Sequence, residues 1–169
     1  MKFESTISSF DSNSLMWEMH IPIPENVFNE MLKIVSDKRV KCILNGSVEH
    51  YCAMMPKVDF HYLLLNKSIM KSMKLKLGDA ISVELFKPNL KYGIPICREF
   101  EEVLENDIEG SDYFHKLGMG AQRTLINVIN KYKNPQLRID RSIILLRHLV
   151  LRNGNLDFKI LNANFKESL

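Results

Sequence analysis

The sequence has few of the residues that mark special classes of protein. Among its 169 residues are three cysteines, Cys42, Cys52 and Cys97, none in a Cys-x-x-Cys pair, which is typical of reduced thiols rather than a disulfide scaffold. Seven glycines form neither a Walker loop nor a dinucleotide-binding fingerprint. Apolar runs such as that from Ile143 to Leu146 are far shorter than a membrane span, and the N-terminus has no apolar stretch long enough for a signal peptide. The sequence therefore predicts a cytoplasmic protein without a membrane segment.

The overall charge is also small. Lysine and arginine number 23 against 20 acidic residues, giving a net charge of +3, and 46% of the residues are hydrophobic. This apolar fraction is that of an ordinary globular chain, and the excess charge is too small to indicate nucleic-acid binding by itself. At this length we expect one domain or two small ones.

Up to about Pro88 the pattern is mainly that of strands. In Leu15–Ile21 every odd position is apolar, the period-two signature of a half-buried strand, and Asn45-Gly46 is a strong hairpin signal. A short helix is predicted after Pro24 and another over Lys67–Met73. Six segments are predicted as strands: residues 2–9, 15–21, 39–44, 48–54, 60–65 and 80–86. Many short strands with turn punctuation favour a small β-barrel.

After Pro95 the pattern becomes helical. Helices are predicted at 98–106, over a short segment capped by Ser111 or Asp112, at 120–132 and at 136–152, with Gly118 and Gly154 at helix ends. The alternation over residues 156–160 predicts a last strand that returns to the barrel. The expected fold is α+β: a small six-stranded β-barrel (residues 1–92) with short helical insertions, an antiparallel helical segment of about four helices (93–154), and a tail (155–169).

Three segments carry a resemblance to a known family. Residues 39–46, residues 77–83 and Ile94-Pro95 before the acidic helix resemble the bacterial bacteriocin-protection, YdeI/OmpD-associated family, over nearly the whole chain. The resemblance implies an N-terminal barrel domain of unknown function joined to a short helical segment, and it brings no established reaction.

The C-terminal part of that family pattern centres on arginines in two successive helices. Arg123, Arg138 and Arg141 fall on those positions. The chain departs from the pattern at three others, where Val128 replaces a Trp, Leu137 a Thr and Asp140 an Arg.

One face of a predicted helix is rich in basic residues. Residues 138, 141, 145, 148 and 152 lie along one side of the last predicted helix, and residues 113–152 carry eight basic residues against one acidic. Arg123, Arg138, Arg141 and Arg152 are therefore the candidate anion-binding or phosphate-binding residues. The alternative, which we favour, is that these charges form a solvated face or pair with the acidic segment 98–112, where seven acids accompany one arginine.

Signals for catalysis or metal binding are weak. His50 and Cys52 share one face of a predicted strand, and His20 and His61 lie on others, yet no His-Glu-x-x-His or paired-cysteine spacing accompanies them. No nucleophile elbow and no isolated Cys–His pattern is found. We therefore predict no metal, no cofactor and no catalytic residue, and an enzyme is the less favoured class.

Two functions from different classes are then expected. The first is a non-enzymatic binding module, with a small molecule or protein partner at the barrel–helix junction; the bacteriocin link comes from the family resemblance alone. The alternative is nucleic-acid binding through the basic helical face, which would weaken steeply with salt.

Overall fold

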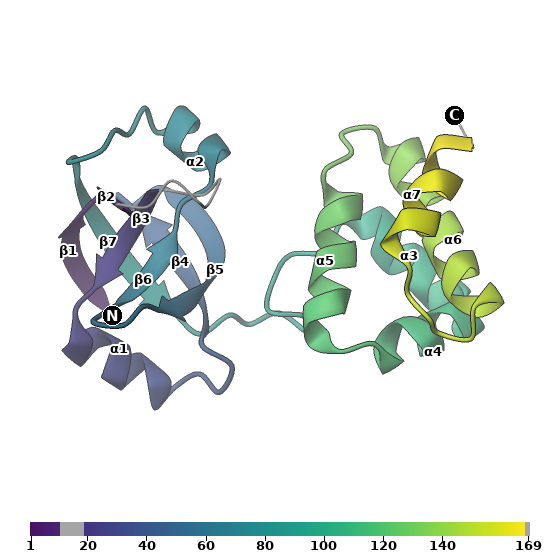
Figure 1. The fold of residues 1–169 in the computed structure, drawn as a ribbon, viewed down its shortest axis with the longest axis horizontal. Coiled ribbons are helices and arrows are strands. Elements are labelled where there is room, and N and C mark those ends of the chain that lie inside the picture. The colour runs from purple at the N-terminus through teal and green to yellow at the C-terminus, as the bar shows by residue number, and fades with distance from the viewer. Residues whose placement is uncertain (11–18, 168–169) are drawn as a thin grey trace. The chain divides into compact units, whose positions relative to one another are not determined.

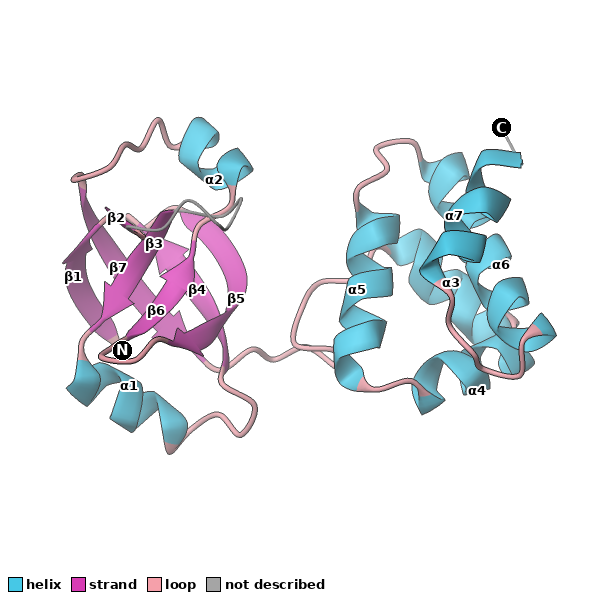
Figure 2. Cartoon of the chain, in the orientation of Figure 1, coloured by secondary structure: helices cyan, strands magenta, loops and turns pink. Residues whose placement is uncertain are grey.

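The computed structural model describes residues 1–10 and 19–167, and the chain divides into two compact units, Met1–Asn89 and Leu90–Leu169. The first unit contains the strands of the described chain and two short helices, and the second contains helices only (Figure 2). The α+β class is confirmed. Within the described residues, no helix has both the length and the apolar character needed to cross a membrane.

The first unit is a nearly closed antiparallel barrel. Its described strands are β1 (Lys2–Thr6), β2 (Ser8–Ser9), β3 (Met19–Ile23), β4 (Arg39–Leu44), β5 (Val48–Pro56), β6 (His61–Leu64) and β7 (Ala80–Phe86). They form one sheet in the order β1-β7-β4-β5-β6-β3-β2. The Ser5 hydroxyl donates to the Pro22 carbonyl at 2.9 Å, which joins β1 to β3 and brings the two ends of the sheet together.

Two helices lie at opposite ends of this barrel, α1 (Glu25–Leu32) and α2 (Lys67–Ser72) (Figure 1). The interior is filled by alternate residues of the strands, because successive side chains of a strand point to opposite faces. The buried cluster includes Val40, Cys42 and Leu44 of β4 and Ile81, Val83 and Leu85 of β7.

The β4–β5 hairpin is confirmed, with Asn45 at φ 47° and Gly46 at φ 69°. Both residues adopt the left-handed conformation that this turn requires. The Asn45 side chain also accepts a hydrogen bond from the Ser82 amide at 2.9 Å, so the turn is tied to β7.

The strand count differs from the expected six. The segment predicted as one strand over residues 2–9 forms two: β1 pairs with β7, and the short β2 pairs with β3. The chain can therefore reach both ends of the sheet within a few residues. Of the strand predicted over residues 15–21, residues 15–18 lie outside the described residues, while Met19–Ile23 forms β3.

The second unit is built from α3 (Arg98–Asn106), α4 (Ile108–Lys116), α5 (Met119–Asn130), α6 (Pro135–Leu151) and α7 (Phe158–Glu167). Their apolar faces enclose a core with Phe100, Phe114, Leu125, Ile126, Leu145 and Leu149 all fully buried. The expectation of about four helices is wrong by one, because the tail is helical.

The tail corrects the prediction of a returning strand. The Asp157 side chain accepts hydrogen bonds from the amides of Lys159 and Ile160, which is how a helix N-terminus is capped. Leu161 and Phe165, four residues apart, are both buried, so the apolar spacing that governs this segment is helical rather than alternating. Similarly, α4 is capped by Asp107 instead of Ser111 or Asp112.

Candidate functional site

A pocket of about 310 Å³ opens on the outer face of the barrel beside β2 and β3. Ile21 and Ile23 of β3 point into the core, so His20 and Pro22 between them occupy the opposite face. The residues that line the pocket are Ser8, Ser9, Phe10, His20, Pro22, Lys57 and Phe60.

Stacked rings form one wall of this pocket. The His20 ring stacks on Phe10 at a centroid distance of 4.0 Å and on Phe60 at 5.6 Å. Tyr62 meets Phe10 edge-on at 5.0 Å and His20 at 5.4 Å. His20 is only 2% exposed. Such contacts hold aromatic rings in fixed orientations, so the wall is preorganised.

Lys57 supplies the positive charge at the pocket. Its Nζ lies 4.1 Å from the Phe10 ring centroid and 6.0 Å from that of Phe60, within the range of a cation–π interaction. The Lys57 amide donates to the Phe60 carbonyl at 2.8 Å, so a tight turn fixes the lysine beside the rings. Ser8 and Ser9 also line the pocket, and the Ser8 hydroxyl donates to the Thr6 carbonyl at 3.3 Å. The Lys57 ammonium can hydrogen-bond an anion.

A thiol pair lies inside the barrel, on the face opposite to that pocket's side chains. Cys42 of β4 and Cys52 of β5 are both buried, and their Sγ atoms are 3.6 Å apart. In the ladder Cys42 faces His50, and Val40 faces Cys52, so the two cysteines are diagonal neighbours.

His50 adjoins the thiol pair. Its Nε2 lies 2.8 Å from the Leu64 carbonyl oxygen, so this nitrogen carries a hydrogen and donates it. The contact with Cys42 lowers the pKa of the Cys52 thiol despite its burial, and His50 and Arg39 lower it further. The same contact with Cys52, together with burial, raises the pKa of Cys42. Burial lowers the pKa of His50, but the contacts with Cys52 and the Leu64 carbonyl outweigh burial and raise it.

The shared face of His50 and Cys52 agrees with the strand alternation. The prediction that the two residues share a face is confirmed, because residues two positions apart on a strand point to the same side. Among the described residues no group of three or more His, Cys, Asp or Glu side chains has the arrangement to hold a metal ion.

Two of the four candidate anion-binding arginines, Arg138 and Arg141, form contacts within the helical unit. The Arg138 Nε donates to the Tyr132 carbonyl at 2.6 Å, and its Nη1 lies 3.3 Å from a Glu99 carboxylate oxygen. The Arg141 Nη1 donates to the Phe165 carbonyl, and its guanidinium lies 5.0 Å from the Phe165 ring centroid and 5.8 Å from that of Tyr132. Arg138 thus pairs with the acidic helix α3, as the alternative interpretation of the charges expects.

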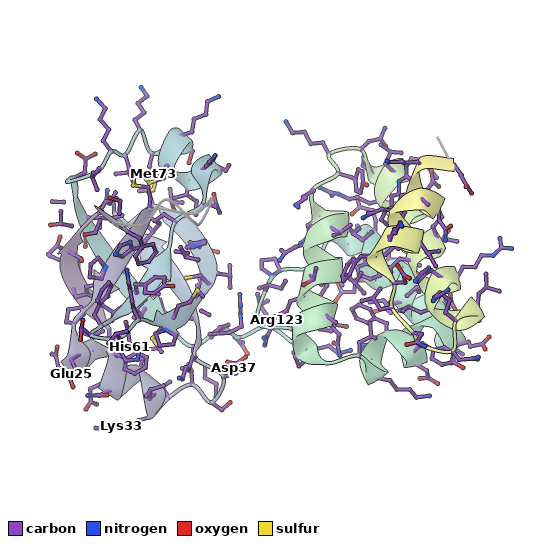
Figure 3. The ribbon with its side chains drawn as sticks, in the orientation of Figure 1. Glu25, Lys33, Asp37, His61, Met73 and Arg123 are labelled. Carbon is purple, nitrogen blue, oxygen red and sulfur yellow. The ribbon has the colours of Figure 1, made fainter. Side chains whose placement is uncertain are left out.

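The other two candidates also contact backbone carbonyls. The Arg123 Nε donates to the Tyr92 carbonyl at 2.8 Å, and Figure 3 shows Arg123 at the side of α5 that faces the segment preceding α3. The Arg152 Nε donates to the Asn155 carbonyl at 3.2 Å, with Asp157 4.0 Å away. Each of the four arginines therefore donates a hydrogen bond to a different backbone carbonyl.

The predicted basic side of the last long helix is, for the most part, its buried side. Arg141 is 3% exposed, Leu145 is fully buried and His148 is 2% exposed. Burial lowers the pKa of His148, and Arg152 lowers it further. These residues share one side of the helix, as predicted, but the prediction that this side faces solvent is wrong. Phosphate binding by the four arginines stays a prediction.

Sequence reasoning missed the aromatic pocket. Phe10, His20, Lys57 and Phe60 come from distant parts of the chain, and none belongs to a recognisable motif. The only local signal was a lysine three residues before a phenylalanine in the turn between two predicted strands. No protein-family model matches the chain, and no curated protein matches it either.

Proposed function

We propose that the protein is a non-catalytic binding module whose ligand occupies the aromatic pocket of the barrel. The observation that carries this proposal is the Lys57 ammonium held 4.1 Å from the Phe10 ring centroid, beside rings stacked on His20. The pocket volume of about 310 Å³ is at the lower end of the range found for small-molecule sites. The ligand is therefore small.

The lining indicates the chemistry of that ligand. The half-buried Phe60 ring offers apolar contact, while the exposed Lys57 ammonium offers donors. A planar aromatic molecule with one anionic substituent satisfies both, since its ring stacks on the wall and its anion faces Lys57. The resemblance to the bacteriocin-protection family, itself a proposal, is compatible with such a binding role.

Titration with 2-naphthoate and with its neutral amide tests the proposal. We expect naphthoate to bind the full-length protein and Lys57→Met to weaken its binding about tenfold or more, the size of one desolvated cation contact. Binding of the amide should change little. Lys33→Met, which removes an exposed lysine of the α1 region (Figure 3), is the matched control and should leave both titrations unchanged.

The proposal fails if the wild-type protein binds neither compound. It also fails if Lys57→Met and Lys33→Met weaken naphthoate binding equally, because the effect would then come from overall charge. Resonances of Ser9 and Phe60 amides in an NMR titration should shift with naphthoate, which locates the bound molecule.

A further inference from the structure

We propose that Cys42 and Cys52 form a dithiol that small hydroperoxides oxidise to a disulfide between β4 and β5. The two Sγ atoms are in contact at 3.6 Å, whereas a disulfide bond measures about 2.05 Å. Formation of the bond therefore requires the two sulfurs to move together from contact distance. This modification site does not depend on the proposed ligand pocket.

The surroundings assign different roles to the two sulfurs. His50 and Arg39 interact favourably with a thiolate on Cys52, and the hydrogen bond to the Leu64 carbonyl fixes the His50 ring. Cys42 is fully buried and keeps its proton. Cys52 is therefore the sulfur that attacks the oxidant, and Cys42 is the sulfur that resolves the product.

Cys52 lies on β5 beyond the part of that strand that pairs with β6. The ladder between β5 and β6 covers only Met54–Pro56 opposite His61–Leu63. Beyond it the Leu64 carbonyl accepts a hydrogen bond from the His50 side chain. Cys52 is 9% exposed in the structure, whereas Cys42 is fully buried. Cys52 is therefore the sulfur that a hydroperoxide reaches first, and a small hydroperoxide suits so buried a thiol better than a bulky disulfide reagent does.

The reaction balances in two steps. The Cys52 thiolate attacks one peroxide oxygen, so that an S–O bond forms, the O–O bond breaks, and the leaving oxygen takes a proton to become an alcohol or water. Cys42 then attacks the Cys52 sulfur: the S–S bond forms, the S–O bond breaks, and the Cys42 proton leaves with the hydroxide as water. Overall, two thiols and one hydroperoxide give one disulfide, one alcohol or water, and one further water.

Cys97 serves as an internal comparison. It lies in the helical unit before α3, partly buried, and burial raises the pKa of its thiol. Among the described residues it has no second cysteine beside it. It therefore has neither the thiolate character nor the resolving partner of Cys52.

Thiol counting on the full-length protein tests the proposal. After treatment with hydrogen peroxide, quenching, unfolding and maleimide labelling, we expect two of the three thiols to be lost together and Cys97 to remain labelled. The intact mass should fall by that of two hydrogen atoms, and dithiothreitol should restore both thiols. Cys97→Ser should change none of this.

Two variants separate the roles of the sulfurs. In Cys42→Ser the oxidised Cys52 has no resolving thiol, so dimedone should trap a sulfenic acid there, and in Cys52→Ser the Cys42 thiol should survive. If a variant does not fold, thiol counting on the wild-type protein still tests whether the disulfide forms. Loss of Cys97 at the same rate, independent loss of single thiols, or dimers linked between chains would each overturn the proposal.

Discussion

At the scale of single residues, the most informative position is Arg141. Its guanidinium is buried at 3% exposure, donates to the Phe165 carbonyl and lies over the rings of Tyr132 and Phe165. An arginine suits this position because its planar head can donate in one direction and stack in another. These contacts tie α6 to α7, so the side chain acts within the core.

Arg141→Met should lower the free energy of unfolding by about 2 kcal/mol, because it leaves the buried Phe165 carbonyl without its charged donor and removes the stacking on two rings. Arg147→Met is the matched control: Arg147 lies on the same helix and is exposed, so its loss should change stability by no more than about 0.5 kcal/mol. Urea unfolding of both variants measures the difference.

A role for Arg141 in anion binding makes a different prediction for the same variants. If it held an anion, inorganic phosphate would stabilise the wild type by mass action and would not stabilise Arg141→Met. We expect no such difference. A phosphate-dependent rise in the wild type alone would restore the anion-binding interpretation of this residue.

At the scale of elements, the packing of α4 against α6 depends on one glycine. Gly110 is buried, and a Cβ added there would lie 2.6 Å from the Leu146 Cβ and 2.5 Å from an Asp107 carboxylate oxygen. Leu146 is fully buried, and Asp107 caps α4 through the Gly110 amide. Neither neighbour can move without loss, so the close approach of the two helices requires glycine.

Gly110→Ala should therefore destabilise the helical unit by about 2–3 kcal/mol, through overpacking and loss of the cap. Gly120→Ala is the control, because a Cβ there meets nothing within 4 Å and the residue lies in α5. The higher helix propensity of alanine should stabilise that variant by up to about 1 kcal/mol. Thermal unfolding that shifted both variants in the same direction would contradict the packing argument.

Elements whose signals are local could be predicted from the sequence. The Asn45-Gly46 hairpin and the helix over 98–106 depend on turn chemistry and apolar spacing within a few residues, and both are confirmed. The tail was mispredicted because a short stretch such as 156–160 fits both periods. The burial of Leu161 and Phe165 against the other helices decides between them, and no short window contains that information.

At the scale of the whole molecule, each of the two units has its own buried core. The barrel encloses the cluster that includes Val40, Leu63 and Val83, while the helical unit buries Phe100, Phe114 and Leu145 among others. The opposite charges of segments 98–112 and 113–152 fall within the second unit. The Arg138–Glu99 pair there is partly buried, and pairs of this kind contribute about 0.2–1 kcal/mol each near a surface.

Fragments 1–89 and 90–169 should each fold alone, since a domain with its own core needs no other part of the chain. Cooperative unfolding by circular dichroism and well-dispersed amide resonances would demonstrate this. Fragment 1–79 is the control: it lacks β7, which pairs with both β1 and β4, and should be unfolded. An unfolded 1–89 fragment would show that the barrel core is insufficient by itself.

Local patterns in the sequence are enough to predict the α+β class and the switch from strands to helices after residue 90 or so. They also predict which side chains share a face within one element, such as His50 with Cys52 or Arg141 with His148. These properties follow from backbone periodicity, which is local. Only the folded chain shows which of those faces is buried and which cysteines are in contact. The pocket lined by Phe10, His20, Lys57 and Phe60 is likewise visible only in the fold. Such features depend on strand register and helix packing between residues far apart in the chain, and those are set by the burial of the whole core rather than by any one segment.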